Sequence, residues 1–197
     1  MNHLSRSDLM SLEQYSEQRS EYRTHVMSHK KNRRVAVGPN ATLYFEDRLT
    51  MQYQVQEILR IEKVFEAAAI EEELEAYNPL IPDGSNWKAT FMIEFAEESE
   101  RKAALAKMIG IEKTLWVSVG DHEKVCPIAN EDLERETEDK TSAVHFLRFE
   151  FTAAMIQSAK SGDPITMGVD HENYQHVTGA LPENIRASLC ADLQMHH

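Results

Sequence analysis

The chain has 197 residues, of which 42% are hydrophobic and 27% are charged, and its formal net charge is -12. This composition is typical of one folded domain with a sizeable core, and the acidic balance argues against binding along a nucleic-acid backbone. Two distant cysteines exclude a disulfide framework and a four-cysteine metal site. No stretch approaches the ~18 apolar residues of a membrane-spanning helix, and no signal-peptide core opens the chain. We therefore expect a cytoplasmic protein that is not inserted in a membrane.

The first third of the chain predicts helices interrupted by one hairpin. SDLMSLEQYSEQR and SEYRTHVMSHKKNRR carry apolar residues at helical spacing and predict an N-terminal helical pair. VAV and TLYF, on either side of Gly38-Pro39-Asn40, predict a β-hairpin. A long helical pattern then runs from Arg48 to Tyr77 and ends at the breakers of NPLIPDG.

After this helix the hydrophobic period changes to two, which is typical of half-buried strands. The predicted strands are Lys88–Phe95, Leu115–Val119, Lys124–Ile128, Val144–Phe151 and Ile165–Val169. Strands separated by tight turns and single helices predict an α+β fold, with a mainly antiparallel sheet covered on one face by the long helix. We expect one domain over residues 1–197, with helices in 1–34 and the sheet and long helix in 35–197.

One glutamate breaks the apolar face of the predicted long helix. At ~100° per residue, Glu62 falls within about 20° of the line through Met51, Val55 and Phe65. A carboxylate on an apolar face costs several kcal/mol unless it is paired or protonated. The pattern therefore predicts a buried partner for Glu62.

Two partners for Glu62 fit the strand patterns. His145 and His171 fall on the apolar faces of their strands, so Glu62, His145 and His171 together would suit an iron or zinc ion with an open position. The alternative is an ion pair between Glu62 and Arg148, with each histidine satisfied by backbone groups. Spacing alone does not decide between them.

Basic residues gather in HKKNRR at the end of the N-terminal helices, in a chain that is otherwise acidic. One interpretation is a docking surface for an acidic partner, formed by Lys30, Lys31, Arg33 and Arg34. The other is a solvated helix end whose cations suit the negative end of the helix dipole. Further on, Asp47 is expected to cap the long helix.

The sequence contains no GxGxxG, GxxxxGK[ST], GxSxG or HExxH motif, so it carries no signature of dinucleotide, P-loop, hydrolase or zincin chemistry. Several long segments resemble one bacterial family instead, catalogued as domain of unknown function three-five-zero-one. They are HKKNRRVAVGPNATLYFEDRLTMQYQVQEILRIEKVF, YNPLIPDGSNWKATFMIEF, EDLERETEDKTSAVHFLRFEF and ITMGVDHENY. The resemblance extends from about Leu4 to Leu193.

The resemblance implies no catalytic residues, because the family has no assigned activity. It does imply a redox-associated role beside rubrerythrin-like proteins and iron–sulfur oxidoreductases. Three functions therefore stay open: an accessory partner protein in redox or peroxide defence, a metal-dependent enzyme using the His/Glu site, and an anion- or nucleotide-binding module. Whether the chain is an enzyme is left undecided by its residues.

Overall fold

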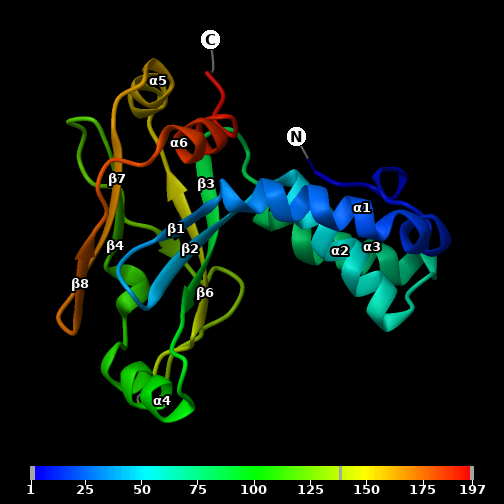
Figure 1. The fold of residues 1–197 in the computed structure, drawn as a ribbon, viewed down its shortest axis with the longest axis horizontal. Coiled ribbons are helices and arrows are strands. Elements are labelled where there is room, and N and C mark those ends of the chain that lie inside the picture. Colours follow the sequence, from blue (N-terminus) through cyan, green and yellow to red (C-terminus); the bar gives the residue numbers. More distant parts are fainter. Residues whose placement is uncertain (1–2, 138, 196–197) are drawn as a thin grey trace.

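The computed structural model describes residues 3–137 and 139–195. The chain forms a larger part, which we call the body, and a smaller helical part that projects from it, which we call the arm (Figure 1). The arm consists of α1 (Leu12–Lys31), α2 (Arg48–Glu62) and α3 (Ala67–Tyr77), with the short 3-10 helices Arg6–Asp8 and Asn78–Leu80 at its ends. The body holds two antiparallel sheets, so the predicted α+β fold is confirmed. The predicted N-terminal helical pair is wrong, because the two segments form one continuous helix, α1.

The larger sheet has the strand order β1-β2-β3-β6-β5. Its strands are β1 (Arg34–Ala36), β2 (Ala41–Glu46), β3 (Asn86–Ile93), β6 (Val144–Glu150) and β5 (Ile128–Ala129). β1 and β2 form the predicted hairpin, in which Gly38 has a φ of +80° and a Cβ there would lie 2.5 Å from the Tyr174 hydroxyl. Glycine fits both demands because it has no Cβ.

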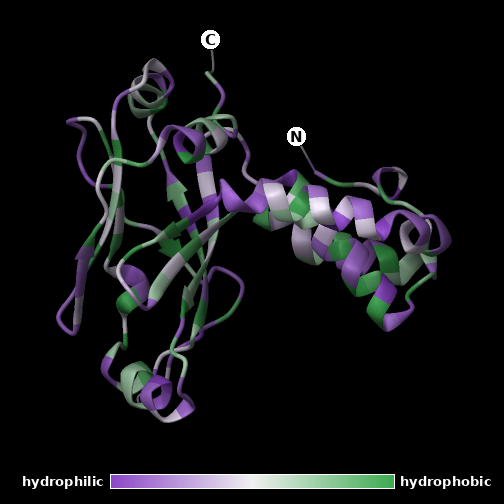
Figure 2. Cartoon of the chain, in the orientation of Figure 1, coloured by the Kyte–Doolittle hydropathy of each residue, from purple (hydrophilic) through white to green (hydrophobic). Residues whose placement is uncertain are grey.

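The smaller sheet has the strand order β4-β7-β8 and packs over one face of the larger sheet. Its strands are β4 (Leu115–Val119), β7 (Ile165–His171) and β8 (Tyr174–Val177). Alternate residues of both sheets, such as Phe91 and Val117, point between the sheets and form the main core. Figure 2 shows hydrophobic residues along the strands of both sheets. The smaller sheet therefore covers the face that we expected the long helix to cover.

Three helices complete the body: α4 (Glu98–Lys107), α5 (Ala153–Ser161) and α6 (Glu183–Cys190), with a 3-10 turn at Ile111–Lys113. Four of the five predicted strands lie where the sequence placed them, within two residues at each end. The fifth prediction, Lys124–Ile128, is mostly wrong. Val125 makes a single bridge to Val117, and the strand that follows covers Ile128–Ala129 and pairs with β6 of the larger sheet.

The arm has a hydrophobic core of its own. Its buried members are Leu4, Met51, Val55, Leu59, Leu74 and Ile81. On the other side of α2, Glu57 accepts hydrogen bonds from the Tyr15 hydroxyl and the Arg19 guanidinium of α1, at 2.6 and 2.7 Å. None of the helices in the described ranges combines the length and apolar character needed to cross a bilayer.

The single long helix predicted from Arg48 to Tyr77 is wrong, because α2 ends at Glu62. Lys63 takes the left-handed conformation, with φ 55° and ψ 42°, and the Val64 amide donates to the Leu59 carbonyl at 2.9 Å. This hydrogen bond is typical of the Schellman arrangement, and Val64 packs against the arm core that contains Leu59, as commonly accompanies that motif. Glycine usually fills the left-handed position, so a lysine there gave no stop signal.

Candidate functional site

The second face of the larger sheet is left open by the smaller sheet and lies beneath the arm. Two cross-strand rows lie side by side on it. The first row is Arg34, Tyr44, Thr90 and Phe146, and the second is Glu46, Lys88 and Arg148. Because strand residues alternate between faces, these side chains point away from the main core.

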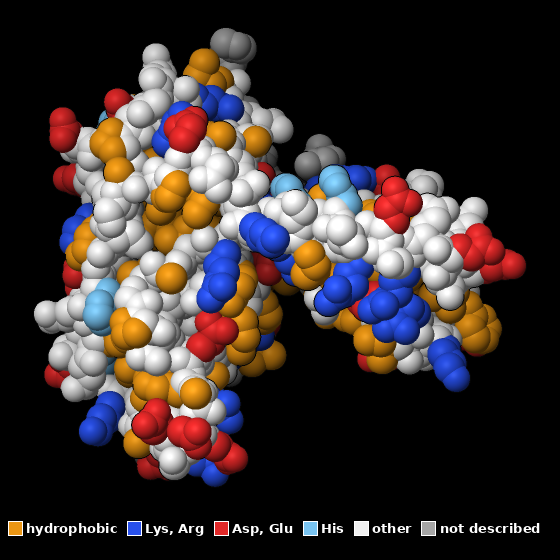
Figure 3. Space-filling view, in the orientation of Figure 1, with side chains coloured by type: hydrophobic (Ala, Val, Ile, Leu, Met, Phe, Trp, Pro, Cys, Tyr) orange, Lys and Arg blue, Asp and Glu red, His pale blue; other side chains and the backbone are white. Residues whose placement is uncertain are grey.

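A cleft separates this open face from the base of the arm. It consists of two adjoining cavities of 640 and 570 Å³, which have the lining residues Glu46, Tyr77, Leu80 and Phe146 in common. Figure 3 looks into the angle between arm and body, where lysine and arginine side chains gather beside hydrophobic ones. Cavities of this size are typical of ligand sites in proteins.

The larger cavity is lined by both methionines and cations. Met27, Met51 and Met92 line it from α1, α2 and β3, and Tyr44 and Phe146 contribute aromatic surface from the sheet. The cations that line it are Lys30, Lys31 and Arg34. Lys30 and Arg34 lie 5.7 and 5.6 Å from the ring centroids of Tyr53 and Tyr44. Such cations retain their capacity to bind an anion, because an aromatic ring does not neutralise their charge.

The smaller cavity is acidic on balance, because Glu46, Glu73, Glu131 and Asp132 line it beside two cations, Lys88 and Arg148, whose hydrogen bonds are satisfied within the chain. Arg148 donates to both carboxylate oxygens of Glu131, at 2.8 and 2.7 Å, and also to Glu150, and these bonds raise the pKa of Arg148. Lys88 donates to the Pro79 carbonyl at 2.5 Å, and its burial lowers the pKa of the ammonium group.

Glu46 lies where the two cavities meet. Its carboxylate is buried and accepts hydrogen bonds from the hydroxyls of Thr50 and Thr90, at 2.7 and 2.9 Å. These bonds join the N-terminus of α2 to β3 and therefore set the distance between the arm and the sheet. The next residue, Asp47, caps α2 as predicted, since it accepts from the Thr50 amide at 2.9 Å.

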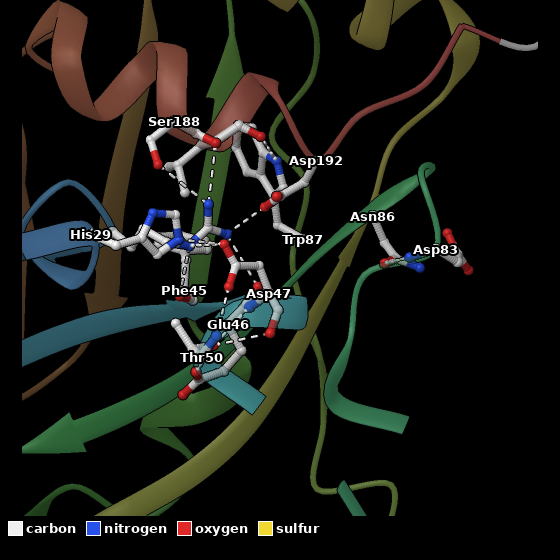
Figure 4. Close-up of polar contacts among 12 residues, drawn as sticks. His29, Phe45, Glu46, Asp47, Thr50, Asp83, Asn86, Trp87, Ser188 and Asp192 are labelled. Atoms are coloured by element: carbon white, nitrogen blue, oxygen red, sulfur yellow. Dashed lines mark hydrogen bonds and ion pairs between the residues drawn. The ribbon is translucent and has the colours of Figure 1, made fainter. Parts of the chain in front are cut away.

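Arg33, the fourth residue of the predicted docking surface, does not line the cleft. It is 2% exposed, and its partners come from the arm, the sheet and the segment around α6. Figure 4 shows three of these partners, Asp47, Ser188 and Asp192, gathered at this junction. The Arg33 guanidinium donates to the carbonyls of Phe45, Glu46 and Ser188, each at 3.1 Å, and to the carboxylate of Asp192. A docking role for Arg33 is therefore wrong, because its donors are already used inside the fold.

The pKa values of the two carboxylates beside Arg33 shift in opposite directions. Burial raises the pKa of Asp192 to about 6, despite the neighbouring guanidinium. Burial would also raise the pKa of Asp47, but Arg33, the Thr50 amide and His29 together outweigh it and lower that pKa. The His29 ring lies 2.5 Å from the Asp47 carboxylate, so the cluster joins the last turn of α1 to the cap of α2.

The structure does not bring together Glu62, His145 and His171. Glu62 is exposed at the last residue of α2, whereas His145 lies in β6 and His171 in β7, which belong to different sheets. The predicted burial of Glu62 is wrong, because the helix ends there and the apolar face does not continue to Phe65. Arg148, the alternative partner, pairs with Glu131 and Glu150 instead.

Both histidines are buried and use both ring nitrogens inside the fold. Nδ1 of His145 accepts from the Asn130 amide at 2.9 Å, so Nε2 carries the proton and donates to the Ser142 carbonyl at 3.0 Å. Burial lowers the pKa of His145, which favours this neutral form. In His171, Nδ1 accepts from the Asn173 amide and Nε2 donates to the Ile109 carbonyl.

A metal ligand must offer a free nitrogen lone pair, and these contacts leave neither histidine with one. The described residues also contain no group of three or more His, Cys, Asp and Glu side chains placed to hold a metal ion. The geometry therefore gives no support to the iron or zinc site that the strand patterns suggested.

The sequence does not predict the cleft, although its basic run contains Lys30, Lys31 and Arg34, which line the larger cavity. One sequence signal could have indicated the cleft: apolar residues, such as Met92 and Phe146, occupy strand positions that face away from the main core. Their counterparts on the arm, Met27, Met51 and Leu80, come from segments that only the tertiary fold brings opposite the sheet.

The fold and the cleft define an α+β protein with a helical arm and a lined site at the base of that arm. The model of the family described as Protein of unknown function (DUF3501) matches residues 3–193, and the chain belongs to this family. The comparison with curated proteins found no match.

One solved structure is similar over nearly its whole length. It is a novel protein of unknown function from Burkholderia pseudomallei, with 47% sequence identity and a TM-score of 0.91. The match covers 97% of this chain and 99% of that one. The family resemblance seen in the sequence is thereby confirmed.

Proposed function

We propose that the protein is an accessory binding protein, whose cleft takes an acidic segment with apolar side chains from a partner protein. One observation carries this proposal: Lys30, Lys31 and Arg34 line the same cavity as Met27, Met51 and Met92. A ligand that fills the cavity must therefore satisfy both apolar surface and positive charge.

A polypeptide segment fits these demands better than a compact ion. The two cavities adjoin between the arm and the sheet, so together they offer more room than a compact ion requires. Methionine side chains are flexible and polarisable, which suits surfaces that accept apolar side chains of different shapes. The cations would guide an acidic segment to the site and fix its orientation.

The partners that the family resemblance implies are rubrerythrin-like proteins and iron–sulfur oxidoreductases. The chain has two cysteines, too few to hold an iron–sulfur cluster with cysteines of its own. A redox role would therefore be exercised through such a partner, and the cleft is the surface we assign to that contact.

The test is capture of a purified rubrerythrin-like or iron–sulfur partner from the same cell. K30S/K31S/R34S should weaken capture by about tenfold or more, since three charge contacts of a few tenths to 1 kcal/mol each are removed. The matched control is K102S/K107S/K140S, which removes three exposed cations elsewhere on the body. Equal capture by both triple variants would contradict the proposal.

The anion- or nucleotide-binding module stays as a second candidate, because 640 Å³ lies in the range of small-molecule cavities. A nucleotide that binds the cleft should raise the melting temperature of the wild type, and K30S/K31S/R34S should lose that shift. A shift in the wild type together with no partner capture would favour the small molecule over the segment.

A further inference from the structure

The turn between α2 and α3 forms an apolar tip at the far end of the arm. Ile61 and Phe65 are 65% and 74% exposed there, and Phe65 is the most exposed of the large hydrophobic side chains described. Figure 1 places this turn away from the body, and Figure 2 shows hydrophobic residues around it. Two large apolar side chains held in water at the end of a projecting arm favour an intermolecular contact.

The tip is also the most acidic part of the arm. Glu62 and Glu66 are exposed on either side of the turn, and Glu71, Glu72 and Glu75 are exposed further along α3, which runs from the tip back to the cleft. Burial, together with the negative charges of Glu62 and Glu72, raises the pKa of Glu73. The tip therefore combines exposed apolar side chains with a strong negative charge.

The larger cavity of the cleft has the complementary chemistry, with apolar methionines and aromatics beside Lys30, Lys31 and Arg34. We propose that the tip of one molecule docks in the cleft of a second copy of this chain. The inference rests on the proposed function, because it takes the cleft to be a site for acidic segments with apolar side chains. It names the tip, formed by Ile61, Phe65 and the glutamates around them, as such a segment.

The position of the two surfaces allows a closed dimer. The cleft lies at the base of the arm, where α1 ends and α2 begins, and the tip lies where α2 ends. Two arms lying antiparallel across a two-fold axis therefore place each tip over the other molecule's cleft. A two-fold arrangement uses both contacts and leaves no free tip or cleft, so it does not grow into a filament.

Self-association of this kind would compete with the partner, because both use the same cleft. The dimer would then be a form in which both clefts are occupied, and an acidic partner segment would displace the tips and separate the two copies. Salt weakens contacts between exposed charges, so dimerisation should weaken as the ionic strength rises.

Sedimentation velocity over a range of protein concentrations tests the proposal. The wild type should associate to a dimer, and I61S/F65S and K30S/K31S/R34S should each weaken that association by at least about tenfold. The control is L133S/V177S, which removes two large side chains that are 56% and 63% exposed elsewhere on the body and should leave association unchanged. All these substitutions lie at the surface, and unchanged melting temperatures would show that the variants remain folded.

A mixture of the two deficient variants adds a sharper test. I61S/F65S keeps an intact cleft and K30S/K31S/R34S keeps an intact tip, so an equimolar mixture should form a heterodimer with one of the two contacts. Recovery of association on mixing supports the tip-in-cleft arrangement. A monomeric wild type, or a dimer that I61S/F65S forms as well as the wild type does, would overturn it.

Partner capture separates failure of this inference from failure of the proposed function. If I61S/F65S captures the partner and the wild type is monomeric, the dimer is wrong and the cleft stands. If the wild type dimerises through tip and cleft but K30S/K31S/R34S captures the partner normally, the dimer stands and the assignment of the cleft to the partner is wrong.

Discussion

Arg33 and Arg34 are neighbours in the chain but have opposite environments. Arg33 is buried and donates to three carbonyls and one carboxylate, whereas Arg34 is exposed at the cleft. Removing Arg33 would leave Asp192 and Asp47 buried without their main cation. Loss of one partner from a buried ion pair commonly costs 3–5 kcal/mol.

We therefore expect Arg33→Met to lower the free energy of unfolding by about 3–5 kcal/mol in a urea titration. Arg34→Met, its matched control, should change that free energy by less than about 1 kcal/mol, because exposed charge contacts are weak. Equal effects of the two substitutions would show that the contacts of Arg33 do not hold the junction together.

Asp192 predicts a particular pH dependence of stability. Burial raises the pKa of its carboxyl from 3.8 to about 6, so the folded state holds a proton that the unfolded state releases. Stability should therefore fall as the pH rises through this interval. Asp47, whose pKa is lowered, contributes stability that is lost as the pH falls, at more acidic pH than the titration of Asp192.

Asp192→Asn removes this titration. The difference in unfolding free energy between wild type and variant should move in favour of the variant by about 2 kcal/mol between pH 4 and pH 6, since one pKa unit corresponds to about 1.4 kcal/mol and part of the titration lies outside this range. Urea titrations across that range measure it. A difference that is constant with pH would mean that Asp192 has an ordinary pKa in the folded state.

At the scale of elements, the end of α2 decides the shape of the arm. Lys63 holds a left-handed conformation that costs most residues roughly 1–2 kcal/mol, a cost that glycine does not have. Lys63→Gly should therefore raise the free energy of unfolding by about 1 kcal/mol, and Lys63→Ala, which keeps the penalty, should not. A loss of stability in Lys63→Gly would indicate that α2 continues through this residue.

The same residue marks the limit of prediction from the sequence. Period-two patterns placed four strands within two residues at each end because burial on one face sets the alternation, and Asp47 as a cap follows from its side chain. The end of α2 was missed because a Schellman turn depends on the contact of Val64 with Leu59 as well as on local residue types. The predicted burial of Glu62 fails for the same reason, because the apolar face of α2 ends where the helix ends.

The candidate site shows the same division. Lys30, Lys31 and Arg34 were singled out by charge alone, and three of the four residues chosen do share one cavity. Charge alone does not separate Arg33 from them, because two of its partners, the Ser188 carbonyl and the Asp192 carboxylate, lie more than 150 residues away in the chain. Burial of a cation depends on such distant contacts, which charge patterns do not record.

At the scale of the whole molecule, the arm and the body have separate hydrophobic cores. The arm should therefore open locally without unfolding the body. Leu59→Ala should cost about 2–5 kcal/mol in the arm and speed amide hydrogen exchange there, while the body keeps its protection. Leu147→Ala is the matched change in the body, and exchange that rises equally in both parts would show one cooperative unit.

The central claim is that the cleft between arm and sheet is the binding site. The most direct measurement places a photo-crosslinker in it, as Phe146→p-benzoylphenylalanine, in the native cell. Phe146 lines both cavities, and Val177 of β8, which is 63% exposed, provides the control position. We expect a specific protein adduct from position 146 that K30S/K31S/R34S reduces, and none from position 177. An adduct that forms equally from both positions, or that the triple substitution leaves unchanged, would contradict it.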